Sequence, residues 1–150
     1  MSDLVITELT SDAQLQAAYP VLSFLRDRLC PETFLDEIRL QEEDGYRLYG
    51  GSVDATIVAI AGIRPAHTLA RGKHVFIDDL ATLPEFQGKG HATRMLRHLA
   101  QRAAAEGWPR IYLDSRDTAR GFYEKIGFQC LTSVPCWIEA DRLAKVAGHM

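Results

Sequence analysis

The feature that most constrains this chain is a glycine-containing turn that joins an apolar stretch to a long amphipathic one. Residues 79–92 read DLATLPEFQGKGHA, with Gly88 and Gly90 in the turn. The N-terminus of a helix has unpaired backbone N–H groups and a partial positive charge. Glycines in front of it remove the Cβ atoms that would keep an anion away from those donors. The segment therefore predicts a cradle for a phosphorylated cofactor at the end of a strand.

The residues after the turn have the period of an amphipathic helix, from about Gly90 to Glu106. Apolar side chains would face the core, whereas arginine, histidine and glutamine occupy the other face. Gly107 and Pro109 are typical of a helix end. We therefore expect the cradle to lie at the start of a long helix.

Two common phosphate-binding motifs do not fit the turn. A Walker A loop needs a glycine, four residues and then Gly-Lys-Ser/Thr, and the chain contains no such string. The dinucleotide fingerprint G-x-G-x-x-G has its first two glycines here, but Thr93 occupies the third position. The pattern Q/R-x-x-G-x-G/A does fit, with Gln87, Gly90 and Ala92. This pattern resembles the acyl-coenzyme A site of the GNAT superfamily of N-acetyltransferases.

A second match lies downstream, in residues 116–128, RDTARGFYEKIGF. It is similar to the A-x-x-F-Y-x-K-x-G-F helix of the same family, and it follows the first motif at the expected separation. Arg116 stands where many members carry an asparagine, and an arginine side chain cannot accept a hydrogen bond. Arg116 would hold a coenzyme phosphate, hold a substrate carboxylate, or contact surface groups near Asp117.

The resemblance implies a fold and an activity. We expect an α/β protein, a single GNAT domain over residues 1–150, with a mixed twisted sheet of about six to seven strands flanked by about four to five helices. The implied reaction is acetyl-CoA-dependent transfer of an acetyl group to a primary amine, in a small molecule or a peptide, by direct attack in a ternary complex. Acetyl-CoA would be the co-substrate, with no metal. The alternative is a non-catalytic acyl-CoA-binding module of the same fold.

Two residues are expected to act in catalysis. A primary amine has a pKa near that of lysine, about 10.4, so a positioned base or a water chain helps at neutral pH. Strand alternation points Asp78 and Asp79 to opposite faces, so only one would face the site. The resemblance favours Asp78 as the base, acting through a water, with a structural role as the alternative. It also implies that the Tyr123 hydroxyl protonates the departing thiolate, unless Tyr123 is only a core aromatic.

Residues of both motifs would bind the cofactor. In the resembling fold, the strand that carries residues 80–82 has a β-bulge and diverges from the next strand, so that the pantetheine arm pairs with free backbone groups. The turn would bind the pyrophosphate. The cofactor-binding residues implied are Leu80, Ala81, Thr82, Gln87, Gly88, Lys89, Gly90, His91, Ala92, Thr93, Arg116 and Phe122.

The other elements are assigned from local pattern, with Pro20 expected to kink or split a long first helix. Gly50, Gly51 and Ser52 are expected to form a turn between two strands. The expected elements are a strand at 4–9, a helix to about 28, a helix from 31 to 45, strands at 46–49 and 55–63, a loop at 64–73, strands at 74–82 and 111–113, a hairpin of 128–131 and 134–138, and a helix at 139–146.

Composition limits the partners. The net charge of −3 argues against a nucleic-acid partner, and the longest apolar run is too short for a membrane span. The first residues have no secretory pattern, so we expect a cytoplasmic protein with reduced cysteines and surface histidines. A homodimer is left open. The acids Glu32, Asp36, Glu37, Glu42, Glu43 and Asp44 would either attract a cationic amine or form a solvated helix face.

Overall fold

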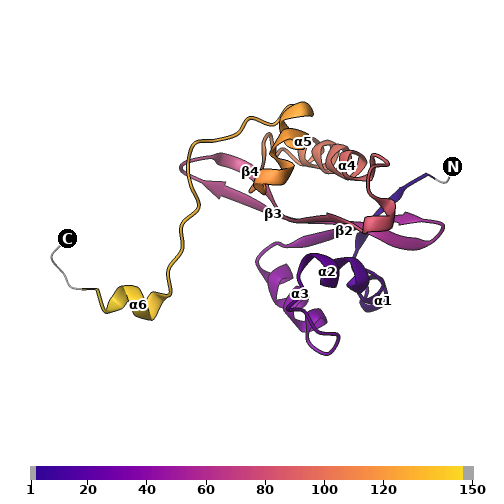
Figure 1. Cartoon of the computed structure of the whole chain (residues 1–150), viewed down its shortest axis with the longest axis horizontal. Coiled ribbons are helices and arrows are strands. Elements are labelled where there is room, and N and C mark those ends of the chain that lie inside the picture. The colour runs from indigo at the N-terminus through magenta and orange to yellow at the C-terminus, as the bar shows by residue number, and fades with distance from the viewer. Residues whose placement is uncertain (1–2, 147–150) are drawn as a thin grey trace. The chain divides into compact units, whose positions relative to one another are not determined.

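A five-stranded mixed sheet organises the first part of the chain (Figure 1). The computed structural model describes residues 3–146, and this part of the chain falls into two compact units that divide after Asp114. In the first unit the strands lie in the order of their numbers, antiparallel except for the parallel pair β4–β5. The strands are β1 (Val5–Leu9), β2 (Arg47–Val53), β3 (Thr56–Thr68), β4 (Gly72–Thr82) and β5 (Ile111–Leu113).

Helices cover both faces of this sheet (Figure 1). Three short helices pack on one face and the long helix α4 packs on the other. On the first face Leu15, Phe34 and Ile60 belong to one core cluster, and on the second face Met95 and Leu99 of α4 are fully buried. The helices are α1 (Asp12–Ala17), α2 (Tyr19–Leu25), α3 (Phe34–Glu43), the 3-10 turn η1 (Pro84–Phe86) and α4 (His91–Ala105).

A proline, a capping box and a glycine set the boundaries of the first three helices. Ser11 and Gln14 exchange side-chain-to-backbone hydrogen bonds at the start of α1. Pro20 lies in the first turn of α2, directly after α1 ends, which confirms the expected split. Gly45, with φ of +94°, follows α3 and ends it as expected.

The hairpin between β2 and β3 turns later than the sequence suggested. β2 runs through Gly50 and Gly51, and the turn consists of Asp54 and Ala55, with φ values of +49° and +66°. Positive φ at both central residues is typical of a two-residue type I′ hairpin. A Cβ on Gly51 would lie 3.0 Å from the sulfur of Met95. The glycines therefore serve close packing within a strand, and the expectation of a turn at residues 50–52 is wrong.

The expected loop at residues 64–73 is also mostly strand. β3 continues to Thr68 and β4 begins at Gly72, so the two strands form a long antiparallel arm. The guanidinium carbons of Arg64 and Arg71 lie 5.8 and 5.9 Å from the ring centre of Phe76. Such cation–π contacts stabilise a pairing that the polar sequence does not suggest.

The second unit contains short helices, and residues 115–146 contain no strand. Its elements are the 3-10 turn η2 (Asp117–Ala119), α5 (Arg120–Lys125) and α6 (Ala140–Ala144). The expected hairpin of 128–131 and 134–138 is therefore wrong, and the sheet has five strands rather than six to seven. Pro135 cannot donate a ladder hydrogen bond, and the side chain of Trp137 is 83% exposed rather than packed on a sheet.

No helix in residues 3–146 is long and apolar enough to cross a membrane. The same residues hold no group of three or more His, Cys, Asp or Glu side chains that could bind a metal ion. Cys30, Cys130 and Cys136 are free thiols.

Gly62 in β3 makes room for a buried tyrosine. The Tyr46 side chain is 4% exposed and lies over Gly62, where an added Cβ would overlap the Tyr46 hydroxyl. Gly62 pairs with Asp79 of β4, and the Tyr46 hydroxyl donates a hydrogen bond to Asp79 Oδ2 at 2.7 Å. The missing side chain therefore lets the hydroxyl reach a carboxylate on the neighbouring strand.

Replacing Gly62 by alanine should lower the free energy of unfolding by about 2 kcal/mol, because the Tyr46 ring must move and give up its hydrogen bond. The matched control is Gly121→Ala in α5, where an added Cβ has open space and alanine is the better helix former. Urea denaturation of both variants measures the difference. Equal stability of the two variants would contradict the packing that we describe.

Candidate functional site

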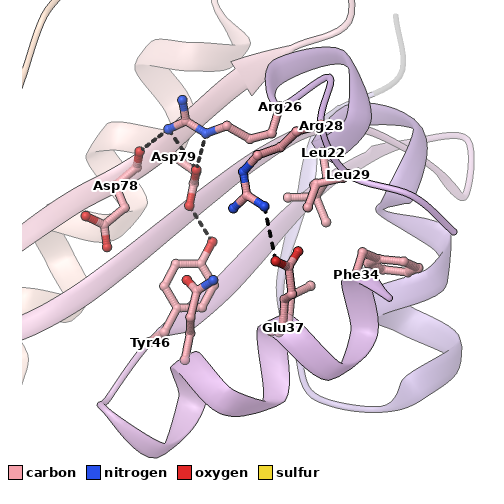
Figure 2. Close-up of a pocket in the computed structure, with 11 residues that line it drawn as sticks. Leu22, Arg26, Arg28, Leu29, Phe34, Glu37, Tyr46, Asp78 and Asp79 are labelled. Atoms are coloured by element: carbon pink, nitrogen blue, oxygen red, sulfur yellow. Dashed lines mark hydrogen bonds and ion pairs between the residues drawn. The ribbon is translucent and has the colours of Figure 1, made fainter. Parts of the chain in front are cut away.

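A β-bulge in β4 shapes the site. Gly62 pairs with Asp79 and the next residue, Ile63, pairs with Ile77, so Asp78 is an extra residue in β4. A bulge interrupts the alternation of side chains along a strand. Asp78 and Asp79 accordingly line the same pocket (Figure 2). The expectation that only one of them faces the site is wrong for this reason.

Asp79 is the centre of a buried polar network (Figure 2). Its carboxylate, 14% exposed, accepts hydrogen bonds from Arg26 Nε at 3.0 Å and from the Tyr46 hydroxyl at 2.7 Å. Arg26 Nη2 also donates to the backbone oxygen of Asp78 at 2.8 Å. Burial, and then the charge of Asp79, raise the pKa of Tyr46 far above its ordinary value. Tyr46 is therefore a neutral donor and not a base.

Asp78 forms a two-point ion pair with Arg64 of β3. Arg64 Nε donates to Asp78 Oδ2 at 2.5 Å and Nη2 donates to Oδ1 at 2.8 Å. These hydrogen bonds raise the pKa of Arg64, so the guanidinium stays charged. Each oxygen keeps a second acceptor position, so a water can bind Asp78 beside Arg64.

The pocket beside these carboxylates has a volume of about 170 Å³ and combines apolar and charged walls. Leu22, Leu29, Phe34 and Ile38 form its apolar side. On the charged side Arg28 and Glu37, both lining residues, form an ion pair of 3.1 Å (Figure 2).

The acid that α3 contributes to the pocket is Glu37 rather than one of residues 42–44. Glu42 forms an ion pair of 2.8 Å with Arg39. Neither Glu42 nor the two acids after it lines the pocket. Whether Glu42, Glu43 and Asp44 attract an amine stays a prediction.

β4 also has an exposed edge at the site. Its pairing with β5 ends at Ile77 and Leu113, whereas its pairing with β3 continues to Thr82. In the described part of the chain, residues 78–82 therefore have a strand neighbour on one side only. The bulge and the divergence of the two strands, expected from the family resemblance, are confirmed.

The cradle follows directly at the end of β4. Gly88 and Gly90 have φ values of +76° and +84°, and an added Cβ on either would meet no atom within 4 Å among the described residues. Gly90 caps α4, whose first intrahelical N–H bond runs from Arg94 to the Gly90 oxygen. The backbone N–H groups of residues 91–93 are therefore free of intrahelical partners, and the first turn of α4 holds no acid.

Side chains of the cradle mostly support the turn. The Gln87 amide nitrogen donates to the Thr82 carbonyl at 2.9 Å, which fastens the turn to the end of β4. Lys89 Nζ lies 5.3 Å from the ring centre of Phe86. His91 is only 8% exposed and His74 only 3%, so the expectation of surface histidines is wrong at these two positions.

The second motif lies in the other unit. Tyr123 of α5 is partly buried between Phe122 and Phe128, with ring centres 5.2 and 5.4 Å from its own. Burial raises the pKa of the Tyr123 hydroxyl above its ordinary value. Arg116 precedes η2, where its carbonyl accepts a hydrogen bond from Ala119. The roles of Tyr123, Phe122 and Arg116 stay predictions.

Sequence reasoning named Asp78 and the glycine turn, whose roles stay predictions, and it did not single out Arg26, Arg28, Arg64 and Tyr46, which the structure places beside Asp78 and Asp79. Gly62 could have indicated the contact with Tyr46, because an isolated glycine within a strand pattern suggests the close approach of another group. Arg64 was assigned to a loop, which hid its place opposite β4. Arg26 and Arg28 follow the end of α2, and no local pattern marks them.

Comparisons with known proteins agree with this geometry. Residues 12–128 match the sequence profile of the Acetyltransferase (GNAT) family. An uncharacterized N-acetyltransferase of Bacillus subtilis (strain 168), YhdJ, is 29% identical over 126 residues, which cover 81% of this chain and 89% of the relative. Thialysine N-epsilon-acetyltransferase of Mus musculus is 26% identical over 85 residues, 52% of this chain and 50% of the relative.

Solved structures share the fold. The aminoglycoside N-acetyltransferase AAC(6')-Iy in complex with CoA superposes with a TM-score of 0.80 at 15% identity, covering 93% of this chain and 97% of that one. An acetyltransferase of Trypanosoma brucei gives a TM-score of 0.76 at 20% identity, covering 91% and 100%. Because the family profile spans β4, the glycine turn and the second motif alike, the chain belongs to the GNAT family of acetyltransferases.

Proposed function

We propose that the chain transfers the acetyl group of acetyl-CoA to a primary amine by direct attack within a ternary complex. One observation carries the proposal: β4 has a bulge beside a pocket and an unpaired edge, and it leads through η1 into the glycine turn that caps α4. A single strand thus brings an acceptor pocket next to a place for a phosphorylated thioester. The names of two similar proteins, an aminoglycoside and a thialysine N-acetyltransferase, support an amine acceptor.

The cradle fits a coenzyme diphosphate. Gly88 and Gly90 leave open space in front of the first turn of α4, where free N–H groups and the helix dipole favour an anion. Lys89 adds a positive charge. Acetyl-CoA would supply the acetyl thioester, and the backbone of residues 80–82 would bind its pantetheine arm as an added strand does.

Acetyl-CoA at one hundred times its Kd should stabilise the protein by about 2.7 kcal/mol, and Gly90→Val should abolish this stabilisation because its side chain would fill the cradle. The matched control is Gly107→Val. Gly107, at the other end of α4, has nearly the same φ of +82° and equally open space, so both variants suffer the same backbone strain. Thermal unfolding with and without acetyl-CoA measures both effects. Loss of the response in both variants, or in neither, would argue against a cofactor at this turn.

Tyr123 is proposed as the donor that protonates the departing thiolate. Its raised pKa keeps the hydroxyl protonated through the neutral range. Because the Tyr123 hydroxyl stays neutral above the ordinary tyrosine pKa of about 10, its ionisation should not lower the rate until the pH exceeds that value.

Tyr123→Phe should lower kcat by about 10- to 100-fold and leave the Kd of acetyl-CoA unchanged, because the hydroxyl acts chiefly as the thiolate leaves. Tyr112→Phe in β5 is the matched control, since its hydroxyl only accepts a hydrogen bond of 3.3 Å from Arg110. Steady-state kinetics of thiol release, together with calorimetric binding, separate the two effects. Full activity of Tyr123→Phe would assign thiolate stabilisation to another group.

Asp78 is proposed as the acceptor of the amine proton, through a water. Arg64 donates one hydrogen bond to each of its oxygens, and an intervening water would bind at a second acceptor position of these oxygens. If Asp78 only supports the bulge, the rate depends on its negative charge and on the Arg64 pair at every pH. If Asp78 accepts the amine proton, the rate no longer depends on Asp78 at a pH where the amine is already neutral.

Asp78→Asn should therefore reduce the rate by about 10- to 1,000-fold at neutral pH, with the loss shrinking as the pH rises toward the pKa of the amine. Arg64→Gln, which frees both Asp78 oxygens, should keep or raise the rate. The pH profile of kcat/KM for both variants decides the matter. Equal losses in the two variants across the whole pH range would make Asp78 a structural residue.

A second candidate is a non-catalytic acyl-CoA-binding module. The observation in its favour is that Arg26, Tyr46 and Arg64 occupy all four oxygens of Asp78 and Asp79. Free thiol release from acetyl-CoA over a panel of primary amines separates the two functions. The module would bind acetyl-CoA and release no thiol with any amine, whereas the enzyme releases thiol in proportion to the acetylated amine.

A further inference from the structure

The carboxylates Asp78 and Asp79 of the acceptor pocket are already paired with arginines. Asp78 and Asp79 each accept hydrogen bonds on both oxygens, from Arg64 and from Arg26 with Tyr46 respectively. Glu37, the third carboxylate of the lining, accepts a hydrogen bond from Arg28 on Oε1. Each carboxylate of the lining is thus paired with an arginine, which compensates the negative charge that a second ammonium group would need.

The guanidinium groups of the same pocket have donors to spare. An arginine carries five N–H donors. Arg28 uses Nη1 alone, toward Glu37 at 3.1 Å, and Arg26 uses Nε and Nη2, so that Arg26 Nη1 has no partner among the described residues. The unused hydrogen-bonding groups on the charged side of the pocket are therefore N–H donors of two guanidinium cations.

Arg28 is also available to a ligand. Its side chain is 69% exposed and that of Glu37 38% exposed. An ion pair in contact with solvent contributes little stability, so a second anion can share or replace it at small cost. A guanidinium binds a carboxylate through two parallel N–H bonds. Arg28 can therefore take a ligand carboxylate without a rearrangement of the fold.

Resting on the proposed function, we propose that the acceptor amine carries a carboxylate, and that Arg28 binds this carboxylate while the amine points toward Asp78. The lining residues Glu37, Asp78 and Asp79 make the pocket unfavourable for a dianion, which selects a carboxylate over a phosphate. The lining also includes the apolar residues Leu22, Leu29, Phe34 and Ile38, which an aliphatic part of the ligand can contact. The acceptor class is thus an amino acid or an ω-amino acid.

The test compares amines that differ only in the carboxylate. The pairs are β-alanine with ethylamine, 5-aminopentanoate with butylamine, and L-leucine with isopentylamine, with O-phosphoethanolamine as the phosphate arm. Each ligand is titrated calorimetrically into the full chain with and without saturating coenzyme A, so that binding is measured without turnover. At least one acid should bind about tenfold or more tightly than its decarboxylated partner.

Two variants of the ion pair should change this preference in opposite directions. Arg28→Gln should weaken the acid about tenfold and leave the decarboxylated amine unchanged, whereas Glu37→Gln frees Arg28 and should tighten the acid several-fold. The matched control is Arg97→Gln on the exposed face of α4, which should change neither. Melting temperatures verify that all three variants fold.

Three outcomes would overturn the inference: equal binding within every pair, tighter binding of O-phosphoethanolamine than of the acids, or no binding of any acid. Equal weakening of acid and amine by Arg28→Gln would likewise remove the role of Arg28. Failure of the proposed function has a different signature, because acetyl-CoA would then neither bind nor release thiol, whichever amine is bound.

Discussion

The site depends on the hydrogen bonds of the partly buried Asp79 carboxylate. Through Tyr46 and Arg26 it connects the start of β2 and the segment after α2 to the centre of β4. A buried carboxylate is costly unless every oxygen is hydrogen-bonded, and loss of one partner leaves the charge unpaired. These partners therefore hold the three segments in one arrangement. Because Arg26 also bonds the Asp78 carbonyl, the same network fixes the bulge.

The bulge in turn organises the rest of β4. Its extra residue places two neighbouring carboxylates on one pocket, and beyond it β4 parts from β5 while staying paired to β3. The strand then ends at the turn that Gln87 fastens to Thr82. The pocket lies at the bulge of β4, the unpaired edge follows along the same strand, and the glycine turn comes after the strand and η1. Their spacing is set by the backbone and does not depend on the packing of separate domains.

Local sequence patterns predicted the parts of this arrangement that local physics controls. The turn with Gly88 and Gly90, the helix after it and the split at Pro20 follow from glycine, proline and periodicity, and all are present. The long β3–β4 arm was missed because cross-strand contacts of arginines with Phe76 stabilise a polar stretch. The network of Asp79 was missed because its members are far apart in the chain. Strand alternation failed at Asp78 because a bulge has no clear local signature.

The contact of Tyr46 with Gly62 has an evolutionary consequence. Any side chain at position 62 collides with the ring, and a tyrosine at 46 without an acceptor at 79 would bury an unpaired hydroxyl. Glycine at 62, tyrosine at 46 and aspartate at 79 are therefore compatible only as a set, and a protein in which one of them alone is replaced is less stable. Natural variation in the acceptor pocket should accordingly accumulate at the exposed Arg28–Glu37 pair, while positions 46, 62 and 79 change together or not at all.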